Sequence, residues 1–298
     1  MQIDATTGNL PVLEALASDT RLAMIGLLNE RPCNISELAD ALSISSAIVT
    51  RHVQKLEAAG LIRCSTQSGR RGMQKICTLA EDVLTVRLRV LTRASDVYVH
   101  EIPVGQYTAY SVQPTCGLAS ATGLIGMSDD PRYFADPAHI QAELLWFGCG
   151  WIEYRVPNYL LGNQTAKSLE ISLELCSEAP RYDEHHPSDI DFTLNGLPIG
   201  LWTSPGDFGA RKGAYTPDWW HGGTQYGLLK TIRVDDTGSH IDGVRMSATT
   251  IADLNIRYGS EITFRLGVDA NARHMGGLNL FGKGFGNYRQ DIRVTMAY

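Results

Sequence analysis

Apolar residues recur at helical spacing near the start of the chain. Segments 13–17 and 21–28 each carry leucine, isoleucine or alanine at intervals of three and four residues. Asp19 and Thr20 precede the second segment, and both are residue types that start helices. Two helices are therefore expected in this region.

Two further helices are predicted by their capping residues. Asn34 and Glu37 form a capping-box pattern at the head of a short helix over 35–42. After a tight turn, Ser45 is suited to cap the next helix, and Gly60 is suited to end it in a left-handed conformation. The apolar residues of this helix fall on one face: Val49, Val53 and Leu56.

After residue 61 the apolar spacing changes from helical to alternating. Segments 63–67 and 73–78 are typical of two short strands, joined by a hairpin tip at 68–72 that contains two glycines and two arginines. Helices, a tight turn, a further helix and a basic hairpin together predict a winged helix-turn-helix. The segment 79–92 fits either a helix or a strand, and both alternatives stay open.

Beyond residue 95 the pattern is typical of an all-β domain. Leucine and isoleucine alternate with serine and glutamate over 168–175, as in a strand with one buried face. Asn195-Gly196 joins two apolar segments as a hairpin turn. About ten short strands separated by long loops predict a two-sheet sandwich or jelly roll. Further strands are expected at 96–103, 106–113, 143–147, 151–156, 228–234, 261–268, 277–281 and 291–297.

Charge is distributed unevenly along the chain. The 298 residues carry a formal net charge of −6, so no global positive field attracts nucleic acid. Residues 1–95 nevertheless hold eleven basic and nine acidic side chains, and residues 51–75 hold six basic side chains against one acidic. This local positive patch coincides with the last predicted helix and the hairpin.

Composition narrows the class of protein. With 44% hydrophobic residues the chain can bury a sizeable core, and its apolar runs are far shorter than the roughly 20 residues that span a bilayer. The N-terminus lacks a basic region followed by an apolar one, so a cytoplasmic location is expected. The six cysteines form no C-x-C or C-x-x-C pair, which indicates reduced thiols rather than a zinc or redox motif. No cofactor and no metal are expected.

A helix that reads DNA bases needs small or polar residues facing the major groove. Arg51 is suited to bidentate contact with guanine, and Lys55 is suited to a phosphate. His52 fits either a backbone contact with DNA or packing beside Val49, and the two alternatives are equal. The remaining residues on the face opposite the apolar stripe are Ser46, Ala47 and Thr50.

The hairpin tip supplies a second candidate contact with DNA. Arg70 and Arg71 are suited to a wing that enters the minor groove or follows the phosphates, where counterion release favours binding. The alternative is a solvated basic loop. The helix pattern just before the hairpin favours the DNA contact.

The N-terminal region resembles the ArsR/SmtB-type winged helix-turn-helix of bacterial transcriptional regulators. The resemblance is carried by SDTRLAMIGLLNERPCNISELADALSISSAIVTRHVQKLEAAGLIRC and spans about residues 10–80. It implies a homodimer on two-fold symmetric operator DNA, with the helix from Ser46 as reader and the hairpin around Gly69 as wing. Three departures stand out: Ser43 occupies a usual glycine position, the helix from Ile35 lacks the C-x-C pair of metal sensors, and no clear dimerising helix follows the wing.

Further motifs stand in the rest of the chain: YSVQPTCGLA, DDPRYFADP, WTSPGDFG, YTPDWW and FGKGFGNYRQDI. Together they resemble the C-terminal half of a group of bacterial ArsR-like regulators. This likeness supports a one-component regulator but implies no particular effector.

A long loop between Trp202 and Leu228 is rich in aromatic and charged residues, and loops of this length are usually functional or mobile. Aromatic faces stack on sugar rings, while Asp and Arg hydrogen-bond hydroxyls, so a carbohydrate pocket is predicted. The equal alternative is that these aromatics cap the core, where Trp146, Phe147 and Trp151 are also expected. The candidate ligand-binding residues are Trp202, Asp207, Arg211, Trp219, Trp220 and His221.

Other candidate chemistries have weaker support. The run of acids and histidines from Asp183 to Asp191 could hold calcium, but a solvated loop fits better because no recognised metal spacing is present. The glycines at 282–286 lack the order of a phosphate-binding loop and indicate a turn. No nucleophile motif supports catalysis, and no catalytic residue is proposed.

The whole sequence predicts a two-domain α+β protein. A winged helix-turn-helix is expected over 1–80, a linker over 81–95, and an all-β sandwich or jelly roll over 96–298. We expect a non-enzymatic, ArsR-like, homodimeric regulator that binds double-stranded operator DNA and responds to a small molecule, first of all a carbohydrate, without a membrane partner. Two alternatives stay open: a carbohydrate-active enzyme with an accessory winged helix, and a dimerisation or protein-docking module.

Overall fold

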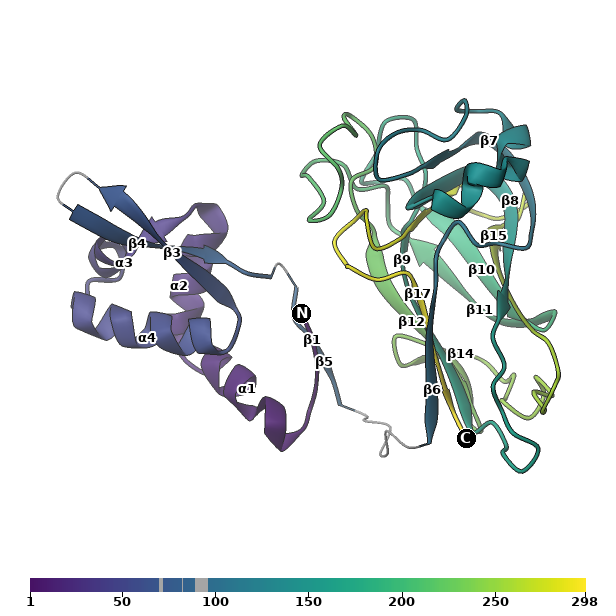
Figure 1. Cartoon of the computed structure of the whole chain (residues 1–298), viewed down its shortest axis with the longest axis horizontal. Helices are drawn as coiled ribbons and strands as arrows, with labels where there is room; N and C mark the ends of the chain where they lie inside the picture. Colours follow the sequence, from purple (N-terminus) through teal and green to yellow (C-terminus); the bar gives the residue numbers. More distant parts are fainter. Residues whose placement is uncertain (70–71, 82, 89–95) are drawn as a thin grey trace. The chain divides into compact units, whose positions relative to one another are not determined.

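The chain folds into two compact units, Met1–Thr92 and Arg93–Tyr298. The computed structural model describes residues 1–69, 72–81, 83–88 and 96–298. Figure 1 shows the helical first unit in purple and blue and the second, all-β unit from teal to yellow. The predicted α+β fold class is confirmed.

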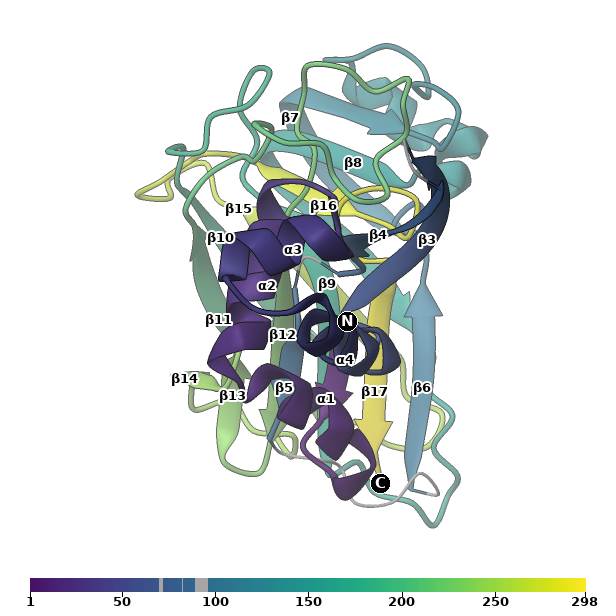
Figure 2. The same ribbon diagram turned by 90° about the vertical axis from the view of Figure 1, so that its left-hand side faces the viewer.

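The N-terminal unit is built around a small apolar core. Met24, Leu38, Val49, Val53 and Leu56 are each 0% exposed, so the predicted stripe of the fourth helix faces inward. The α-helices, all labelled in Figure 2, are α1 Leu10–Leu16, α2 Asp19–Glu30, α3 Ile35–Leu42 and α4 Ser46–Ala58; a short 3-10 helix, η1 Thr7–Asn9, precedes them.

The predicted caps are present at both central helices. Asn34 Oδ1 accepts from the Glu37 N–H at 2.9 Å, and Glu37 Oε2 accepts from the Asn34 N–H at 2.8 Å, which completes the capping box of α3. Asn34 Nδ2 also donates to Gln74 Oε1 at 2.9 Å, so the cap ties α3 to the sheet. Ser45 Oγ accepts from the Ile48 N–H at the start of α4. Ser43 ends α3 with φ 55°, the left-handed conformation that a glycine adopts more easily.

A three-stranded sheet completes this unit, in the order β2 (Cys33–Asn34), β4 (Gly72–Leu79), β3 (Ile62–Gly69). β3 and β4 form the predicted antiparallel hairpin, whose tip residues Arg70 and Arg71 lie outside the described residues. In the open segment 79–92 the strand alternative holds at β5 (Thr85–Arg87), which pairs in parallel with β1 (Gln2–Asp4).

The C-terminal unit contains one antiparallel sheet of twelve strands. Its main path runs β11-β10-β15-β8-β16-β9-β12-β13-β14; β7 also pairs with β8, and β17 joins β9 to β6. The strands are β6 Val97–Ile102, β7 Ala109–Ala119, β8 Leu144–Val156, β9 Ser168–Cys176, β10 Ser188–Leu194, β11 Leu197–Ser204, β12 Leu228–Asp235, β13 Gly238–Ile241, β14 Val244–Ser247, β15 Ile262–Val268, β16 Leu278–Phe281 and β17 Ile292–Ala297, with short 3-10 helices η2 Pro131–Ala135 and η3 Pro137–Gln141 between β7 and β8.

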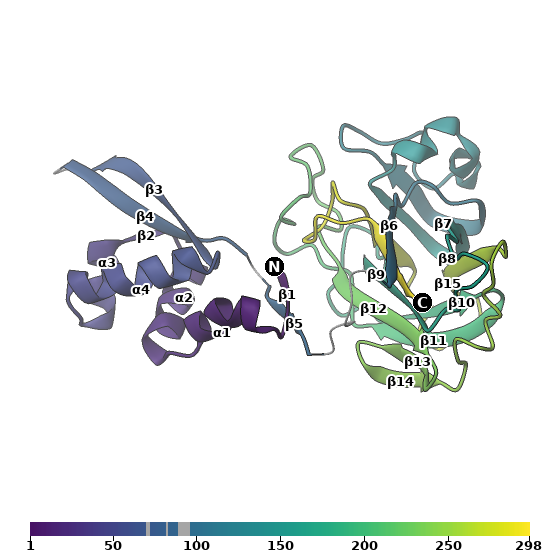
Figure 3. The same ribbon diagram turned by 60° about the horizontal axis from the view of Figure 1, so that its bottom comes forward.

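This sheet curls until its two ends meet. Gly200 of β11 lies so close to β13 and β14 that a Cβ there would be 3.1 Å from both Ile241 Cδ1 and Met246 Cβ (Figure 3). Phe192 and Phe264, both 0% exposed, point into the interior from neighbouring strands. The predicted all-β architecture is therefore confirmed, as a nearly closed barrel.

Two strand predictions differ from the structure. β8 runs unbroken through residues 148–150, where a break between two strands was expected. Glycines occupy this part of the strand because β7 approaches so closely that no larger residue fits. A Cβ on Gly148 would stand 2.6 Å from the Pro114 carbonyl oxygen. A Cβ on Gly150 would overlap the Ser111 carbonyl oxygen. The β13–β14 hairpin was not predicted, although Asp242-Gly243 at its turn is a strong hairpin signal.

No helix within the described ranges is both long enough and apolar enough to cross a bilayer.

Asn34→Ala should lower the free energy of unfolding of the N-terminal unit by about 1 kcal/mol, because it removes the side-chain acceptor at the start of α3. Urea unfolding followed by helical circular dichroism measures this change. Asn29→Ala is the matched control, since Asn29 is exposed near the end of α2. Equal stability of the two variants would contradict the role of the cap.

Candidate functional site

Helix α4 presents a polar face to solvent. Ser46, Ala47, Arg51 and Lys55 are exposed, and Thr50 is half-buried with its Oγ1 donating to the Ser46 carbonyl at 2.8 Å. Ile48 is 45% exposed in the first turn of the same helix and was not among the predicted contacts. An apolar side chain at this place is suited to a thymine methyl group.

His52 lies on the inner side of this face. Its Nδ1 is 3.4 Å from Arg21 Nη1, and burial together with the Arg21 charge lowers the pKa of His52. Arg21 is itself buried and donates to the last carbonyls of α1, from Nε to Ala15 at 2.6 Å and from Nη2 to Glu14 at 2.7 Å. The arginine therefore links α1, α2 and α4, and His52 contacts it.

The hairpin is fixed to α4 by an ion pair. Lys75 Nζ of β4 lies 2.7 Å from Glu57 Oε2. This contact holds the base of the wing against the helix that precedes it. The predicted wing contacts, Arg70 and Arg71, stand outside the residues that the structure describes.

The six predicted ligand residues do not form one site. Trp202 lies on β11 and packs against the main core, with Lys230 Nζ 4.6 Å from its ring centroid. The guanidinium carbon of Arg211 lies 4.3 Å from the ring centroid of Tyr226. Trp219 and Trp220 pack edge-to-face against a separate apolar cluster, as the core-capping alternative proposed.

Trp220 and His221 do line a pocket of about 340 Å³, named here the loop pocket. Its wall includes Trp146, whose ring centroid lies 5.6 Å from that of Trp220. Asp207 is buried just behind this wall. Its Oδ2 accepts from the Ala179 N–H at 3.0 Å and from Thr224 Oγ1 at 2.9 Å, and both donors line the pocket. Further lining residues are Thr115, Ser128, Asp129, Glu178, Arg181 and Asn279.

Glu178 is the acid at the centre of the loop pocket. Its Oε2 accepts from Asn279 Nδ2 at 2.7 Å and its Oε1 from Thr115 Oγ1 at 3.1 Å. Burial, followed by repulsion from Asp207, raises the pKa of Glu178 to about 8. Burial also raises the pKa of Asp207 to about 7. No sequence pattern indicates this pair, because Glu178 follows β9 and Asp207 follows β11 in separate loops.

A third buried acid organises the loops nearby. Glu174 accepts from the N–H groups of Gly227, Asn287 and Tyr288 at 2.8–2.9 Å, and it is 1% exposed. Burial raises the pKa of Glu174 to about 7. The glycines at 282–286 form a turn beside it, as predicted.

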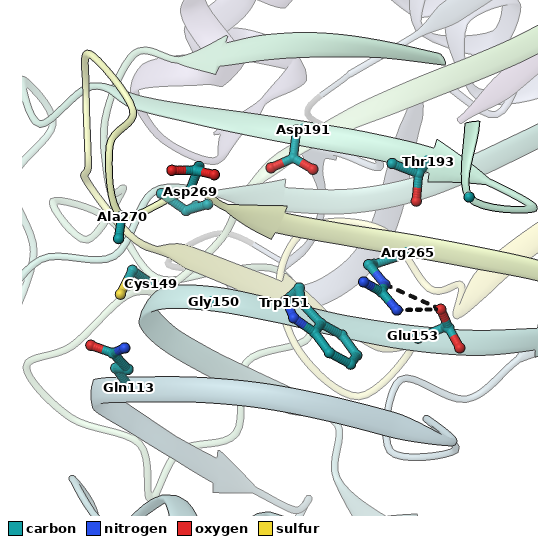
Figure 4. Close-up of a pocket in the computed structure, with 12 residues that line it drawn as sticks. Gln113, Cys149, Gly150, Trp151, Glu153, Asp191, Thr193, Arg265, Asp269 and Ala270 are labelled. Atoms are coloured by element: carbon teal, nitrogen blue, oxygen red, sulfur yellow. Dashed lines mark hydrogen bonds and ion pairs between the residues drawn. The ribbon is translucent and has the colours of Figure 1, made fainter. Parts of the chain in front are cut away.

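A second concavity lies on the outer face of the sheet, and Figure 4 shows it. This sheet groove measures about 370 Å³ and crosses β7, β8, β15 and β10. Arg265 donates to Glu153 Oε2 from Nε at 3.1 Å and from Nη2 at 2.9 Å, and its guanidinium lies 3.7 Å from the Trp151 ring centroid. The prediction that Trp151 belongs to the core is therefore wrong: strand alternation turns it outward, while Phe147 and Trp146 are buried as expected.

Strand register explains why the groove is hollow. Asp191 of β10, Gly267 of β15 and Trp151 of β8 stand side by side, so a residue without a side chain separates a carboxylate from an indole. Asp191, Asp269, Thr193 and Gln113 also line the groove. Within the described ranges, the side chains of Asp191, Thr193 and Gln113 make no hydrogen bond to other residues, so their polar atoms are available to a ligand.

The acidic run from Asp183 to Asp191 does not form a metal site. Asp189 Oδ1 accepts from Thr203 Oγ1 at 2.7 Å and contacts His274 Nδ1 at 3.1 Å. Among the residues that the structure describes, no group of three or more His, Cys, Asp or Glu side chains is arranged to hold a metal ion.

The stability of the C-terminal unit should fall as pH rises from about 4 to about 8, between the pKa values of its buried acids in the unfolded chain and in the folded unit. Glu174, Glu178 and Asp207 have raised pKa values, so the folded unit keeps protons that the unfolded chain has released. Each acid can contribute up to about 1.4 kcal/mol per pH unit within this window. Thermal unfolding across the window measures the effect, and Glu178→Gln should make the fall shallower; an unchanged slope in that variant would contradict the assignment.

Comparison with known proteins assigns the N-terminal unit. A helix-turn-helix domain model matches residues 16–65. A helix-turn-helix transcriptional regulator of Methanocaldococcus jannaschii is 43% identical over 49 residues, which is 16% of this chain and 52% of that protein, so the chain spans about half the length of this curated relative.

Two solved structures are also similar to part of the chain. An ArsR family transcriptional regulator is 31% identical, with 26% of this chain and 75% of that chain covered and a TM-score of 0.23. HlyU from Vibrio cholerae is 23% identical, with 24% and 75% covered and a TM-score of 0.21. The helical unit therefore contains a helix-turn-helix domain.

Proposed function

We propose that this protein is a one-component transcriptional regulator whose helical unit binds operator DNA and whose β unit binds a small-molecule effector. The observation that carries the proposal is the exposed polar face of α4, held outward by Val49, Val53 and Leu56 inside a matched helix-turn-helix domain. A β unit with two polar concavities supports the effector half.

On DNA, α4 lies in the major groove. Arg51 reads a guanine, Lys55 contacts a phosphate, and Ser46, Ala47 and Thr50 allow the first turn to approach the bases. Arg70 and Arg71 of the wing bind the phosphates or the minor groove, while His52 keeps α4 in place through Arg21. Two copies of the chain bind a two-fold symmetric operator as a homodimer.

The effector we propose for the sheet groove is a carbohydrate. Sugars need an aromatic face together with planar polar groups that donate and accept hydrogen bonds. The groove supplies an indole at Trp151, a guanidinium at Arg265 and carboxylates at Asp191 and Asp269. Its position on an open sheet face suits an elongated oligosaccharide more than a buried monosaccharide.

Effector binding alters operator affinity by favouring one arrangement of the two reading helices in the dimer. Coupling of this kind is typically worth about 1–3 kcal/mol.

Arg51→Ala should weaken operator binding by about ten- to a hundredfold and relax specificity at one base pair, because a bidentate contact is lost. Arg71→Ala should instead weaken binding to all sequences and reduce the salt dependence. Fluorescence anisotropy with operator DNA selected from a random pool, and with unrelated DNA, separates the two effects. Arg132→Ala is the control, since Arg132 is 89% exposed in the other unit and pairs with Asp130. Identical behaviour of the Arg51 and Arg71 variants would contradict this division.

Asp191→Asn and Trp151→Ala should abolish oligosaccharide binding measured by calorimetry or by an oligosaccharide array. Asp236→Asn makes the same chemical change on an exposed turn outside the groove and should leave binding intact. Retained oligosaccharide binding in the Asp191 and Trp151 variants would show that the sugar does not bind in the sheet groove.

The same assay tests the enzyme alternative. Release of shorter sugars from a bound oligosaccharide would show turnover, which a regulator does not require. If a surface of the β unit became buried as the protein concentration rose, and no sugar bound, the dimerisation or protein-docking alternative would be favoured.

A further inference from the structure

The loop pocket combines features that the sheet groove lacks. Its Trp220 wall is held in place, because Trp220 Nε1 donates to the Thr224 carbonyl at 2.8 Å. Trp219, which is outside the pocket lining, donates from Nε1 to the Ala121 carbonyl at 2.8 Å. Trp219 also packs edge-to-face on Trp220, with ring centroids 5.6 Å apart. The indole N–H groups are thus occupied, and the wall offers π surface to a ligand.

Carboxylates face this aromatic wall. Glu178 lines the pocket, and its two oxygens accept from Thr115 and Asn279. Asp129 lines it from the loop after β7, with only Oδ1 engaged, by the Cys116 N–H at 3.0 Å. The acids therefore accept hydrogen bonds from neutral donors, and no ion pair among the described residues neutralises Glu178 or Asp129.

A further buried acid is incompletely satisfied. Asp207 is 0% exposed, and its Oδ1 has no hydrogen-bond partner among the described residues. It lies behind Ala179 and Thr224, which line the pocket, and its charge disfavours ionisation of Glu178. A buried carboxylate without a counter-ion is costly, so a positive charge in the pocket would stabilise this cluster.

Basic side chains do not supply that charge. Arg181 and His221 line the pocket, but both are exposed, and in the part of the chain that the structure describes neither forms an ion pair with Glu178 or Asp129. A metal ion fits poorly, because the carboxylates are not grouped as metal ligands within the described ranges and indoles do not coordinate hard cations. Aromatic faces do attract organic cations, with carboxylates as the complementary charge.

We propose that the loop pocket binds a protonated organic amine, with the ammonium group between Glu178 and Asp129 and the carbon skeleton against Trp146 and Trp220. This site is separate from the sheet groove and goes beyond the proposed sugar effector. It also gives a role to Trp220 and Asp207, two of the residues that the loop composition singled out.

The test is a thermal-shift measurement on the full chain at neutral pH, without DNA. Each amine is compared with a neutral molecule of similar shape: butylamine with butanol, putrescine with 1,4-butanediol, glucosamine with glucose, and choline with 3,3-dimethylbutanol. At least one amine should raise the melting temperature of the β unit by several degrees at saturation, while its neutral counterpart does not. Equal effects within every pair, or no effect from any amine, would overturn the proposal, as would a response to calcium, magnesium or potassium salts in place of amines.

Matched variants locate the site. Glu178→Gln keeps the shape but cannot ionise, so it should raise the melting temperature of the free protein and abolish the response to amine. Asp129→Asn should weaken the response at least tenfold. Asp236→Asn, on an exposed turn outside both pockets, should leave the response unchanged. A full amine response in Glu178→Gln would overturn the assignment, and because no DNA or oligosaccharide is present, the outcome does not depend on the proposed regulator function.

Discussion

The β unit depends on buried carboxylic acids that accept hydrogen bonds from backbone and neutral side-chain donors. Glu174 accepts from three backbone N–H groups and so joins the loop before β12 to the loop after β16. Asp207 joins the loop after β11 to the segment after β9 in the same way, through Ala179 and Thr224. These contacts position the aromatic loop and bury several acids beneath it. The preference for a positively charged ligand that we propose for the loop pocket follows from this arrangement.

Strand alternation is the second constraint. On β8, β10 and β15 the inward residues fill the barrel interior, and their neighbours one residue along line the sheet groove. Because the core holds the inward residues in place, it also holds the strands that carry the outward side chains. Rigid positioning of this kind favours ligand recognition. In the helical unit, buried Arg21 has the corresponding role, because it binds the end of α1 and contacts His52 of α4.

Local signals were sufficient for the helical unit. The capping box at Asn34 and Glu37, the cap at Ser45 and the apolar stripe of α4 depend on residues at most seven positions apart, and all are found as predicted. The candidate pockets depend on long-range register instead. Asn279 reaches Glu178 because β16 pairs with β9, and Thr115 reaches it because β7 and β16 both pair with β8; no sequence pattern specifies these pairings. Trp151 was misplaced for a related reason: an aromatic residue beside glycines is compatible with either face of a strand.

The central claim is that the β unit controls the affinity of the helical unit for DNA. The most direct test is the dissociation constant of the full chain for selected operator DNA, measured with and without a saturating ligand that has already been shown to bind the β unit. The account predicts a change of about five- to 150-fold, with an equal change in ligand affinity when operator is saturating. An operator affinity that stays the same while the ligand is bound would show that the two units act independently and would contradict the account.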